Sequence, residues 1–462
     1  MNISIKFKQI LALDKGLFSV TKNIYKTQEE EPGHQFKSVK RIKRVFWIYA
    51  ASIGELKSAL YISRLIAELP YFKNNNIKPL FFVSFDTASA YRIYKKIPLA
   101  VLPGYVFFFH PISCPGFAVR SYAKKIKPDF FISVEHAIHK NLIIALSKLN
   151  ARICYLGLDF GSDYAKKKEK KIDHLKSVDK KLLKNICISV TDEAGKEKLV
   201  KEYGNALYSI TVLQDPLKLN ITDIYQPYSS HVSQVSSDAP AVKNTEGGVE
   251  GYKDKTYRVI AFVSVHKKET DFFLRLMPSI KKEVENGIDS AKKLKLIFIP
   301  RNIKNVAKIK RKALKAKFKP VYFKKDGIPV KDFTNMDGAD VLIIDEYGVL
   351  NDIYKYADIV YVGKSLFAEE RGGHNVIEPA VYAKPVITGP FADNFKDIIE
   401  IFLKNDAITV FNQEEFTRLF AGFIKNEKLW KNRGLNAYNT YMERKKKAKD
   451  NLSDFFNKEL FG

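Results

Sequence analysis

Short runs of apolar residues recur along the first half of the chain, and the segments between them carry apolar residues at helical spacing. Such runs occupy Val45–Ala50, Leu80–Ser84, Val106–Phe109, Phe130–Glu135, Arg152–Leu156, Cys187–Val190 and Ser209–Leu213. Runs that are apolar at nearly every position are typical of strands buried on both faces of a parallel sheet. Their alternation with helical segments predicts a doubly wound α/β domain.

The second half repeats this pattern after a polar interruption. Gln226–Lys255 is rich in Ser, Pro and Gly and has no periodicity, which is typical of a flexible linker. Further strands are predicted at Arg258–Val263, Leu294–Ile299, Val341–Asp345, Ile359–Gly363 and Val386–Thr388, and helical patterns continue from Glu414 to the end. We therefore divide the chain into a first domain (1–222), a linker (223–256), a second domain (257–430) and a final helix (431–462).

Composition fits this division and narrows the choice of partners. The chain has 462 residues with 46% hydrophobic composition, enough for two domains with their own cores. Its formal net charge of +27 fits a nucleic acid, an anionic membrane or an anionic substrate, but solvated lysine-rich faces would give the same excess. The amphipathic stretch Met1–Thr27 is equally open: it fits a membrane-bound segment or an ordinary first helix.

The cysteines and the apolar runs exclude several classes of protein. Cys114, Cys154 and Cys187 show no C-x-x-C spacing, which argues against a disulfide framework or a zinc site and favours a reducing compartment. No stretch reaches 18 apolar residues, and no signal peptide is seen, so we expect no membrane-spanning helix. No carboxylate or histidine cluster has metal spacing, and we expect no metal and no cofactor.

The first candidate for chemistry follows the first predicted strand. Ala51-Ser52-Ile53-Gly54-Glu55 joins that strand to a helical pattern. This position places Glu55 at the carboxyl end of a strand, where open α/β sheets bind ligands. A glutamate in the first turn of a helix is also favoured by the helix dipole, so a purely structural role remains open.

A second candidate lies at Arg371–Phe395, RGGHNVIEPAVYAKPVITGPFADNF. Glycines such as Gly372 and Gly373 let the backbone approach a ligand closely. The pattern predicts a short helix over 376–382, whose first amides would suit an anion such as phosphate. Glu378, one turn into that helix, is placed to accept hydrogen bonds from sugar hydroxyls.

The stretch GGHNVIEPA…KPVITGPFADNF closely resembles the donor-site signature of the Kdo transferases. Those enzymes transfer 3-deoxy-D-manno-octulosonic acid (Kdo) from its CMP-activated form to lipid A. The resemblance implies a glycosyltransferase B architecture, in which two Rossmann-like doubly wound domains face a cleft. It also implies that the first domain binds the acceptor, the second binds the CMP-sugar donor, and the last helix crosses back to the first domain.

Several motifs of the second domain carry the same resemblance. Ser264–Glu269 is similar to the family's S-T-H-E-G-E, Pro300-Arg301 to P-R-H-P-E, Asp345–Leu350 to D-T-M-G-E-L, and Gly363–Leu366 to G-G-S-L. A guanidinium at a strand end also suits an anionic donor. The resemblance implies donor binding by Ser264, His266, Arg301, Gly348, Gly372, Gly373, His374, Asn375, Glu378 and Asn394.

The first domain resembles the family less evenly. Ser52–Glu55 resembles S-V-G-E, whose glutamate is the family's proposed catalytic base, and Asp215–Leu219 resembles G-S-L-K-F. The resemblance implies that Glu55 is the base and that Ser52, Gly54, Glu135 and Lys218 bind the acceptor. Other acceptor-side motifs differ: Asp86–Ser89 replaces P-T-G-S, Ala137 replaces a second acid, and Gly157–Gly161 replaces N-A-R-L-S.

The resulting hypothesis is an inverting, metal-independent transfer of Kdo from CMP-Kdo to lipid A precursor. It places the enzyme peripherally on the cytoplasmic face of the inner membrane, with an anionic membrane surface and no nucleic acid as partner. Because the acceptor-side motifs differ, a related glycosyltransferase B enzyme with another donor or acceptor is the alternative. A basic nucleic-acid-binding protein without catalysis is a third possibility, although no binding motif supports it.

Overall fold

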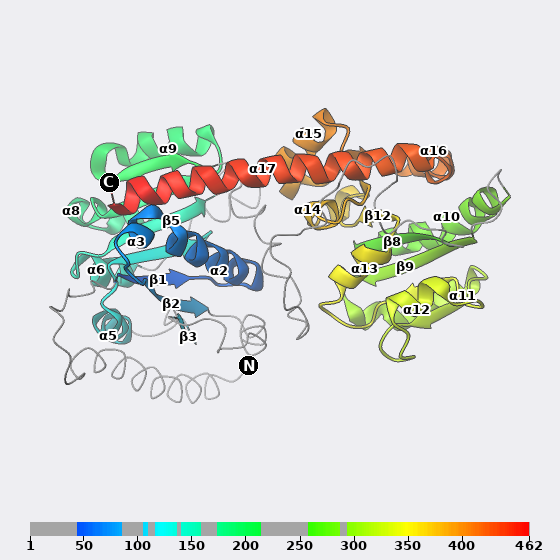
Figure 1. Cartoon of the computed structure of the whole chain (residues 1–462), viewed down its shortest axis with the longest axis horizontal. Coiled ribbons are helices and arrows are strands. Elements are labelled where there is room, and N and C mark those ends of the chain that lie inside the picture. Colours follow the sequence, from blue (N-terminus) through cyan, green and yellow to red (C-terminus); the bar gives the residue numbers. More distant parts are fainter. Residues whose placement is uncertain are drawn as a thin grey trace. The chain divides into compact units, whose positions relative to one another are not determined.

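The computed structural model describes residues 44–85, 105–109, 116–135, 140–158, 173–213, 257–286 and 293–461. The chain divides into two compact units (Figure 1). Unit 1 takes the residues up to Gln226 together with Lys445–Gly462, and unit 2 takes Pro227–Arg444. Predictions on Met1–Thr27, the linker 223–256, Asp86–Ser89, Ala137 and Lys218 fall outside the described residues.

Unit 1 is built on a seven-stranded parallel sheet of order β3-β2-β1-β4-β5-β6-β7. Its strands are β1 (Val45–Tyr49), β2 (Leu80–Phe85), β3 (Tyr105–Phe109), β4 (Phe130–Val134), β5 (Arg152–Leu158), β6 (Ile186–Val190) and β7 (Ser209–Val212). Its helices include α2 (Ile53–Glu68), α3 (Pro70–Asn74), α5 (Gly116–Ile126), α6 (Lys140–Ser147), α8 (Lys180–Leu183) and α9 (Glu193–Tyr203).

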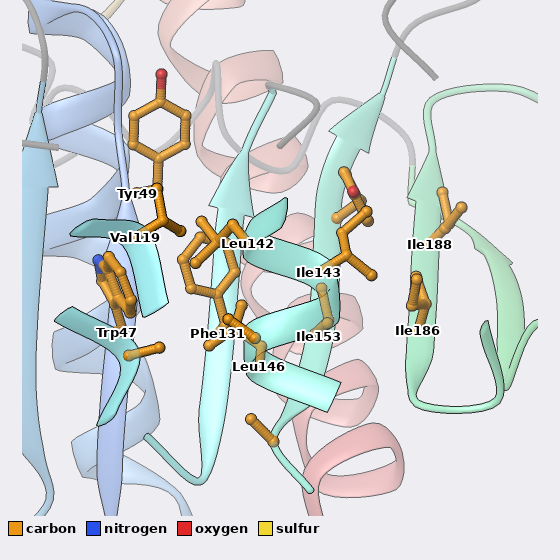
Figure 2. Packing of buried hydrophobic residues seen from close by; sticks show 14 of the residues in the cluster. Trp47, Tyr49, Val119, Phe131, Leu142, Ile143, Leu146, Ile153, Ile186 and Ile188 are labelled. Atoms are coloured by element: carbon orange, nitrogen blue, oxygen red, sulfur yellow. The ribbon is translucent and has the colours of Figure 1, made fainter. Parts of the chain in front are cut away.

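Successive side chains of each strand enter two different cores, which is why these strands are apolar throughout. Trp47 and Phe131 pack on one face with α6, with ring centroids 5.1 Å apart (Figure 2). The buried Trp47 indole donates to Ser84 Oγ at 2.7 Å. Phe46 points to the other face, which is covered by α2 and by the end of α17 (Glu427–Phe461).

Unit 2 contains a second seven-stranded parallel sheet, of order β10-β11-β9-β8-β12-β13-β14. Its strands are β8 (Tyr257–Val265), β9 (Lys293–Pro300), β10 (Pro320–Tyr322), β11 (Val341–Ile343), β12 (Ile359–Val362), β13 (Val386–Thr388) and β14 (Ile408–Val410). Its helices include α10 (Lys267–Glu285), α11 (Val306–Lys315), α12 (Val330–Asn335), α13 (Leu350–Tyr356), α14 (Ile377–Ala380), α15 (Lys396–Lys404) and α16 (Gln413–Lys425).

Aromatic residues fill the core of unit 2. Phe262 stacks on Phe298 with ring centroids 4.8 Å apart, and Phe273 and Phe416 pack edge-on at 5.1 Å. Helix α17 buries Trp430 in this core and buries Leu452 and Phe456 in the core of unit 1. Among the described helices, none combines the length and the apolar character needed to span a bilayer.

Two parallel doubly wound sheets confirm the predicted α/β class. The sequence pattern missed β10 and β14, which have three residues each and lie at the two edges of the second sheet. The predicted helix over 376–382 is wrong in extent, because α14 covers only Ile377–Ala380. It gives way to a turn in which Ala383 adopts φ +51° and the Lys384 amide bonds Pro379 O at 3.1 Å.

Candidate functional site

Each sheet reverses its strand order beside its first strand. In unit 1 the chain runs from β1 to β2 on one side and places β4 on the other. In unit 2 it runs from β8 to β9 on one side and places β12 on the other. Ligands of open α/β sheets bind at the carboxyl ends of the strands at such a switch point. The candidate site residues are therefore those that follow β1 and β4, or β8 and β12.

Glu269, in the first turn of α10, is the centre of the switch point in unit 2. Its side chain is fully buried, and its two carboxylate oxygens accept five hydrogen bonds. The donors are the amides of His266 (3.0 Å), Lys364 (2.8 Å), Ser365 (2.9 Å) and Leu366 (3.2 Å) and the hydroxyl of Tyr361 (2.6 Å). Glu269 thus fixes the loop after β12 against the start of α10. Burial and this carboxylate together raise the pKa of Tyr361 well above its usual range.

Close packing at this junction explains Gly363, the first residue after β12. A Cβ there would lie 2.7 Å from Glu269 Oε2 and 2.8 Å from Val265 Cα. Ser264, near the end of β8, adopts the left-handed conformation at φ +54°. The carbonyl of Val265 accepts the amide of Arg301 at 3.1 Å. This bond brings the predicted donor residues Ser264 and Arg301 to adjacent strand ends.

Gly372 and Gly373 connect the loop after β12 to the loop after β13. Gly373 N donates to Lys364 O at 2.7 Å, and Gly372 N donates to Phe391 O at 2.8 Å. Gly372 O in turn accepts the amide of Asn394 at 2.8 Å. Both glycines have positive φ, +130° and +72°, and a Cβ on Gly373 would lie 2.8 Å from that of Ala392. Only glycine fits this crossing, and the predicted approach of its backbone to a ligand stays a prediction.

His374 and His266 meet at the same place. Their Nε2 atoms are 3.3 Å apart. Burial, followed by the nearby charges of Arg301, His266 and Lys364, lowers the pKa of His374 to about 3. His374 is therefore a neutral imidazole at neutral pH, held among cationic side chains. Such surroundings favour an anionic ligand.

Lys364 is a residue of this cluster that the sequence reasoning did not select. Its backbone has φ +65°, a conformation in which glycine is far easier to accommodate. Its ammonium lies beside Gly372: a Cβ there would be 3.1 Å from Lys364 Nζ and 3.2 Å from Asn394 Nδ2. In the described part of the chain, no acidic side chain forms an ion pair with the Lys364 ammonium. The sequence did contain a signal for this residue, because Lys364 stands where the family motif G-G-S-L has its second glycine.

Asn375 and Glu378 form a neighbouring polar pair. Asn375 Oδ1 accepts the amide of Ile377 at 2.9 Å, and its Nδ2 donates to Glu378 Oε1 at 3.4 Å. Tyr354 donates to Glu378 Oε2 at 3.3 Å, and burial followed by this carboxylate raises the pKa of Tyr354 well above its usual range. Because α14 is a single turn whose first amide is already capped by Asn375, its dipole adds little to anion binding.

Gly348 and the exposed Arg301 complete the predicted donor set. Gly348 lies in the loop after β11 at φ +92°, two strands away from β8. Arg301 follows β9, beside β8, and its charge acts on His374. The structure therefore brings together Ser264, His266, Arg301, Gly372, Gly373, His374 and Asn394, places Asn375 and Glu378 in the next turn, and leaves Gly348 further along the sheet edge.

In unit 1, Ser52 and Glu55 form a capping box at the start of α2. Glu55 Oε2 accepts the amides of Ala51 at 2.6 Å and Ser52 at 3.3 Å, and Ser52 Oγ accepts the amide of Glu55 at 3.3 Å. Glu55 is largely buried, at 8% exposure, whereas Gly54 is exposed. Glu135, just after β4, adopts φ +52° and donates its amide to Leu156 O at 2.8 Å.

Two units, each built on a parallel sheet with a switch-point turn, define a protein of the glycosyltransferase B fold. A crystal structure of a glycosyltransferase from Rickettsia africae ESF-5 matches with a TM-score of 0.50, covering 91% of this chain and 99% of that one at 12% identity. This likeness shows the fold.

Sequence comparisons find similarity to the Kdo transferases in part of the chain. Residues 26–216 match the family model described as 3-deoxy-D-manno-octulosonic-acid transferase (kdotransferase). A transferase of that name from Aquifex aeolicus (strain VF5) is 32% identical over 31% of this chain and 35% of its own length. Another, from Rickettsia felis, is 25% identical over 81% of this chain and 70% of its own length. These matches confirm the resemblance to the Kdo transferases, and this chain spans about a third of the Aquifex protein's length.

Proposed function

We propose that this chain transfers Kdo from CMP-Kdo to a lipid A precursor, without a metal and with inversion at the anomeric carbon. The observation that carries the proposal is the cationic cluster at the switch point of unit 2. Lys364, Arg301 and the backbone of Gly372-Gly373 converge there around a neutral His374. CMP-Kdo brings two anionic groups, a phosphodiester and the sugar's own carboxylate, to such a surface.

We assign donor binding to unit 2 and the acceptor and base to unit 1. The donor residues are Ser264, His266, Arg301, Gly348, Gly372, Gly373, His374, Asn375, Glu378 and Asn394, to which we add Lys364. Ser52, Gly54, Glu135 and Lys218 are assigned to the acceptor. The acceptor is a phosphorylated glycolipid, so we place the enzyme at the cytoplasmic face of the inner membrane.

In the proposed reaction, Glu55 takes the proton from an acceptor hydroxyl as that oxygen attacks the anomeric carbon. A new carbon–oxygen bond forms, and the bond from the anomeric carbon to the phosphate oxygen breaks. CMP leaves with the bonding electrons, and the developing negative charge on its phosphate is stabilised by the cations around Gly372-Gly373. Attack from the face opposite the leaving group inverts the anomeric centre.

The direct test is to incubate the purified full-length protein with CMP-Kdo and lipid A precursor and to analyse the glycolipid by mass spectrometry. We expect products heavier by one or more Kdo units, at a rate that EDTA leaves unchanged. A strict need for a divalent metal would contradict the mechanism but not the fold. Transfer from another nucleotide sugar, with none from CMP-Kdo, would favour the related glycosyltransferase suggested by the altered acceptor-side motifs.

A further inference from the structure

The densest run of positive charge in unit 2 begins at Arg301 of the donor cluster and continues along the chain beyond it. From Arg301 to Lys325 the sequence contains eleven lysines and arginines and no aspartate or glutamate. Most of this run forms α11 and the turns on either side of it (Figure 1). A general excess of lysine would be spread among acidic residues. A general excess of lysine therefore does not explain a run of basic residues on a folded helix with no acidic residue among them.

Helix α11 sorts these residues into two faces. Ile309 and Ala313 are buried in the core of unit 2 and attach the helix to it. Lys308, Arg311 and Lys315 follow one another at spacings of three and four residues, so they form one row on the exposed side. Lys304 lies one turn earlier at the same spacing and is also exposed.

Acidic neighbours pair with the flanks of this helix but not with the row. Lys310 lies 3.8 Å from Asp326, Lys312 pairs with Asp271, and Lys324 lies 2.7 Å from Glu346. Across the residues that the structure describes, no such partner is found for Lys304, Lys308, Arg311 or Lys315. The row therefore presents four uncompensated charges to solvent, in an arrangement that attracts an extended anionic surface.

An apolar side chain at the edge of the row helps to choose between anionic partners. Leu314 is 56% exposed and lies between Arg311 and Lys315 in the sequence. A leucine beside cations can enter the interface of a bilayer, while the lysine and arginine head groups bind lipid phosphates. The rings of Phe318 and Tyr322, which follow the helix, are buried and are therefore not available for stacking with bases.

We infer that the row Lys304, Lys308, Arg311 and Lys315, with Leu314, docks unit 2 on a membrane surface of anionic phospholipid. None of these five residues belongs to the donor cluster, and the docking requires neither the donor nor the acceptor. It would hold the second unit at a membrane, where the glycolipid acceptor of the proposed function is found. The inference is tested by binding alone, so it can fail while the proposed activity stands.

The test is co-sedimentation of the full-length protein with vesicles of equimolar phosphatidylcholine and phosphatidylglycerol. The variant replaces Lys308, Arg311 and Lys315 by glutamine, which leaves Ile309 and Ala313 in place. Losing three surface-bound cations should weaken vesicle binding about 100-fold. A matched control replaces Lys196, Lys198 and Lys201 of α9 by glutamine, which changes the net charge equally on a helix that also carries Glu193, Glu197 and Glu202.

We expect the α9 control to bind like the wild type, and neither protein to bind vesicles of phosphatidylcholine alone. Salt should release the bound protein, because exposed charge is screened within about 10 Å at 0.1 M. Leu314→Ser should weaken binding to the anionic vesicles while leaving its salt dependence in place. Three results would overturn the inference. These are wild-type binding by the α11 variant, an equal loss in the α9 control, and tighter binding to duplex DNA or RNA than to the vesicles.

Discussion

The turns after β1 and β8 both contain a capping box, but the glutamates of the two boxes bind different parts of the chain. Each begins a helix with a glutamate at the third position, Glu55 in α2 and Glu269 in α10, whose carboxylate accepts the amide of the capping residue. Glu55 also binds the amide of Ala51 in its own turn. Glu269 instead binds amides almost a hundred residues further along the chain and is fully buried.

The bonds of Glu269 to the loop after β12 give it a structural role. Five donors surround Glu269, so its carboxylate is committed to holding the loop that carries Lys364. Glu55 stands at the carboxyl end of β1 and retains a small exposed fraction. Identical sequence spacing therefore does not establish identical roles.

The largest effect is expected for Glu269→Ala. The substitution leaves the amides of Lys364, Ser365 and Leu366 buried without their acceptor, and we expect the free energy of unfolding to fall by roughly 3–5 kcal/mol. Denaturant titration of the full-length protein measures this loss, and amide exchange should locate it at residues 364–366. Glu415→Ala is the matched control, since Glu415 closes an exposed capping box in α16 and should cost about 1 kcal/mol or less. Equal losses in the two variants would contradict the structural role of Glu269.

The loop that Glu269 holds gives the second prediction. Lys364→Gly relieves the left-handed backbone, so stability should stay level or rise by up to about 1 kcal/mol. Loss of the ammonium should weaken CMP-Kdo binding about tenfold, as expected for one charged hydrogen bond. Calorimetry of donor binding and a thermal melt measure the two quantities. Lys396→Ala, which removes an exposed cation from α15, should leave donor affinity unchanged; a similar loss there would mean that only the overall charge matters.

The smallest expected effect is a pH dependence of the free energy of unfolding that arises from His374 and is seen only at acid pH. Its pKa is about 3 in the folded protein, against an ordinary value of 6.5. Between these values the unfolded chain binds a proton that the folded chain does not. The stability is therefore complete above pH 6.5 and is lost as the pH falls toward 3.

Replacing His374 by glutamine should remove this pH dependence. At about pH 5 it amounts to roughly 1–2 kcal/mol of the free energy of unfolding, after allowance for partial exposure. Denaturant titrations of both proteins at neutral and acid pH measure it. The two proteins should differ more at acid pH than at neutral pH, with the variant gaining relative stability. An NMR titration in which the His374 ring protonates near its ordinary pKa of 6.5 would contradict the assignment.

The sequence predicted the two sheets because their central strands are buried on both faces and are therefore apolar runs, as at Val45–Tyr49. It missed β10 and β14, since three-residue edge strands carry too few positions for a pattern. The stretch Arg371–Phe395 supplied the candidate site, and its glycines lie at the crossing of the loops after β12 and β13. Neither the five bonds of Glu269 nor the ammonium of Lys364 was visible in advance, because both depend on contacts between segments far apart in the chain.

The most direct test of the distinction between the two turns is the turnover of Glu55→Gln with CMP-Kdo and lipid A precursor. The glutamine carbonyl can still accept the amide of Ala51, so the turn and the stability should persist to within about 1 kcal/mol. Loss of the base should lower turnover by about 10²–10⁴-fold while CMP-Kdo affinity, measured by calorimetry, stays at the wild-type value. A folded variant that turns over at close to the wild-type rate would show that Glu55, like Glu269, serves only the structure.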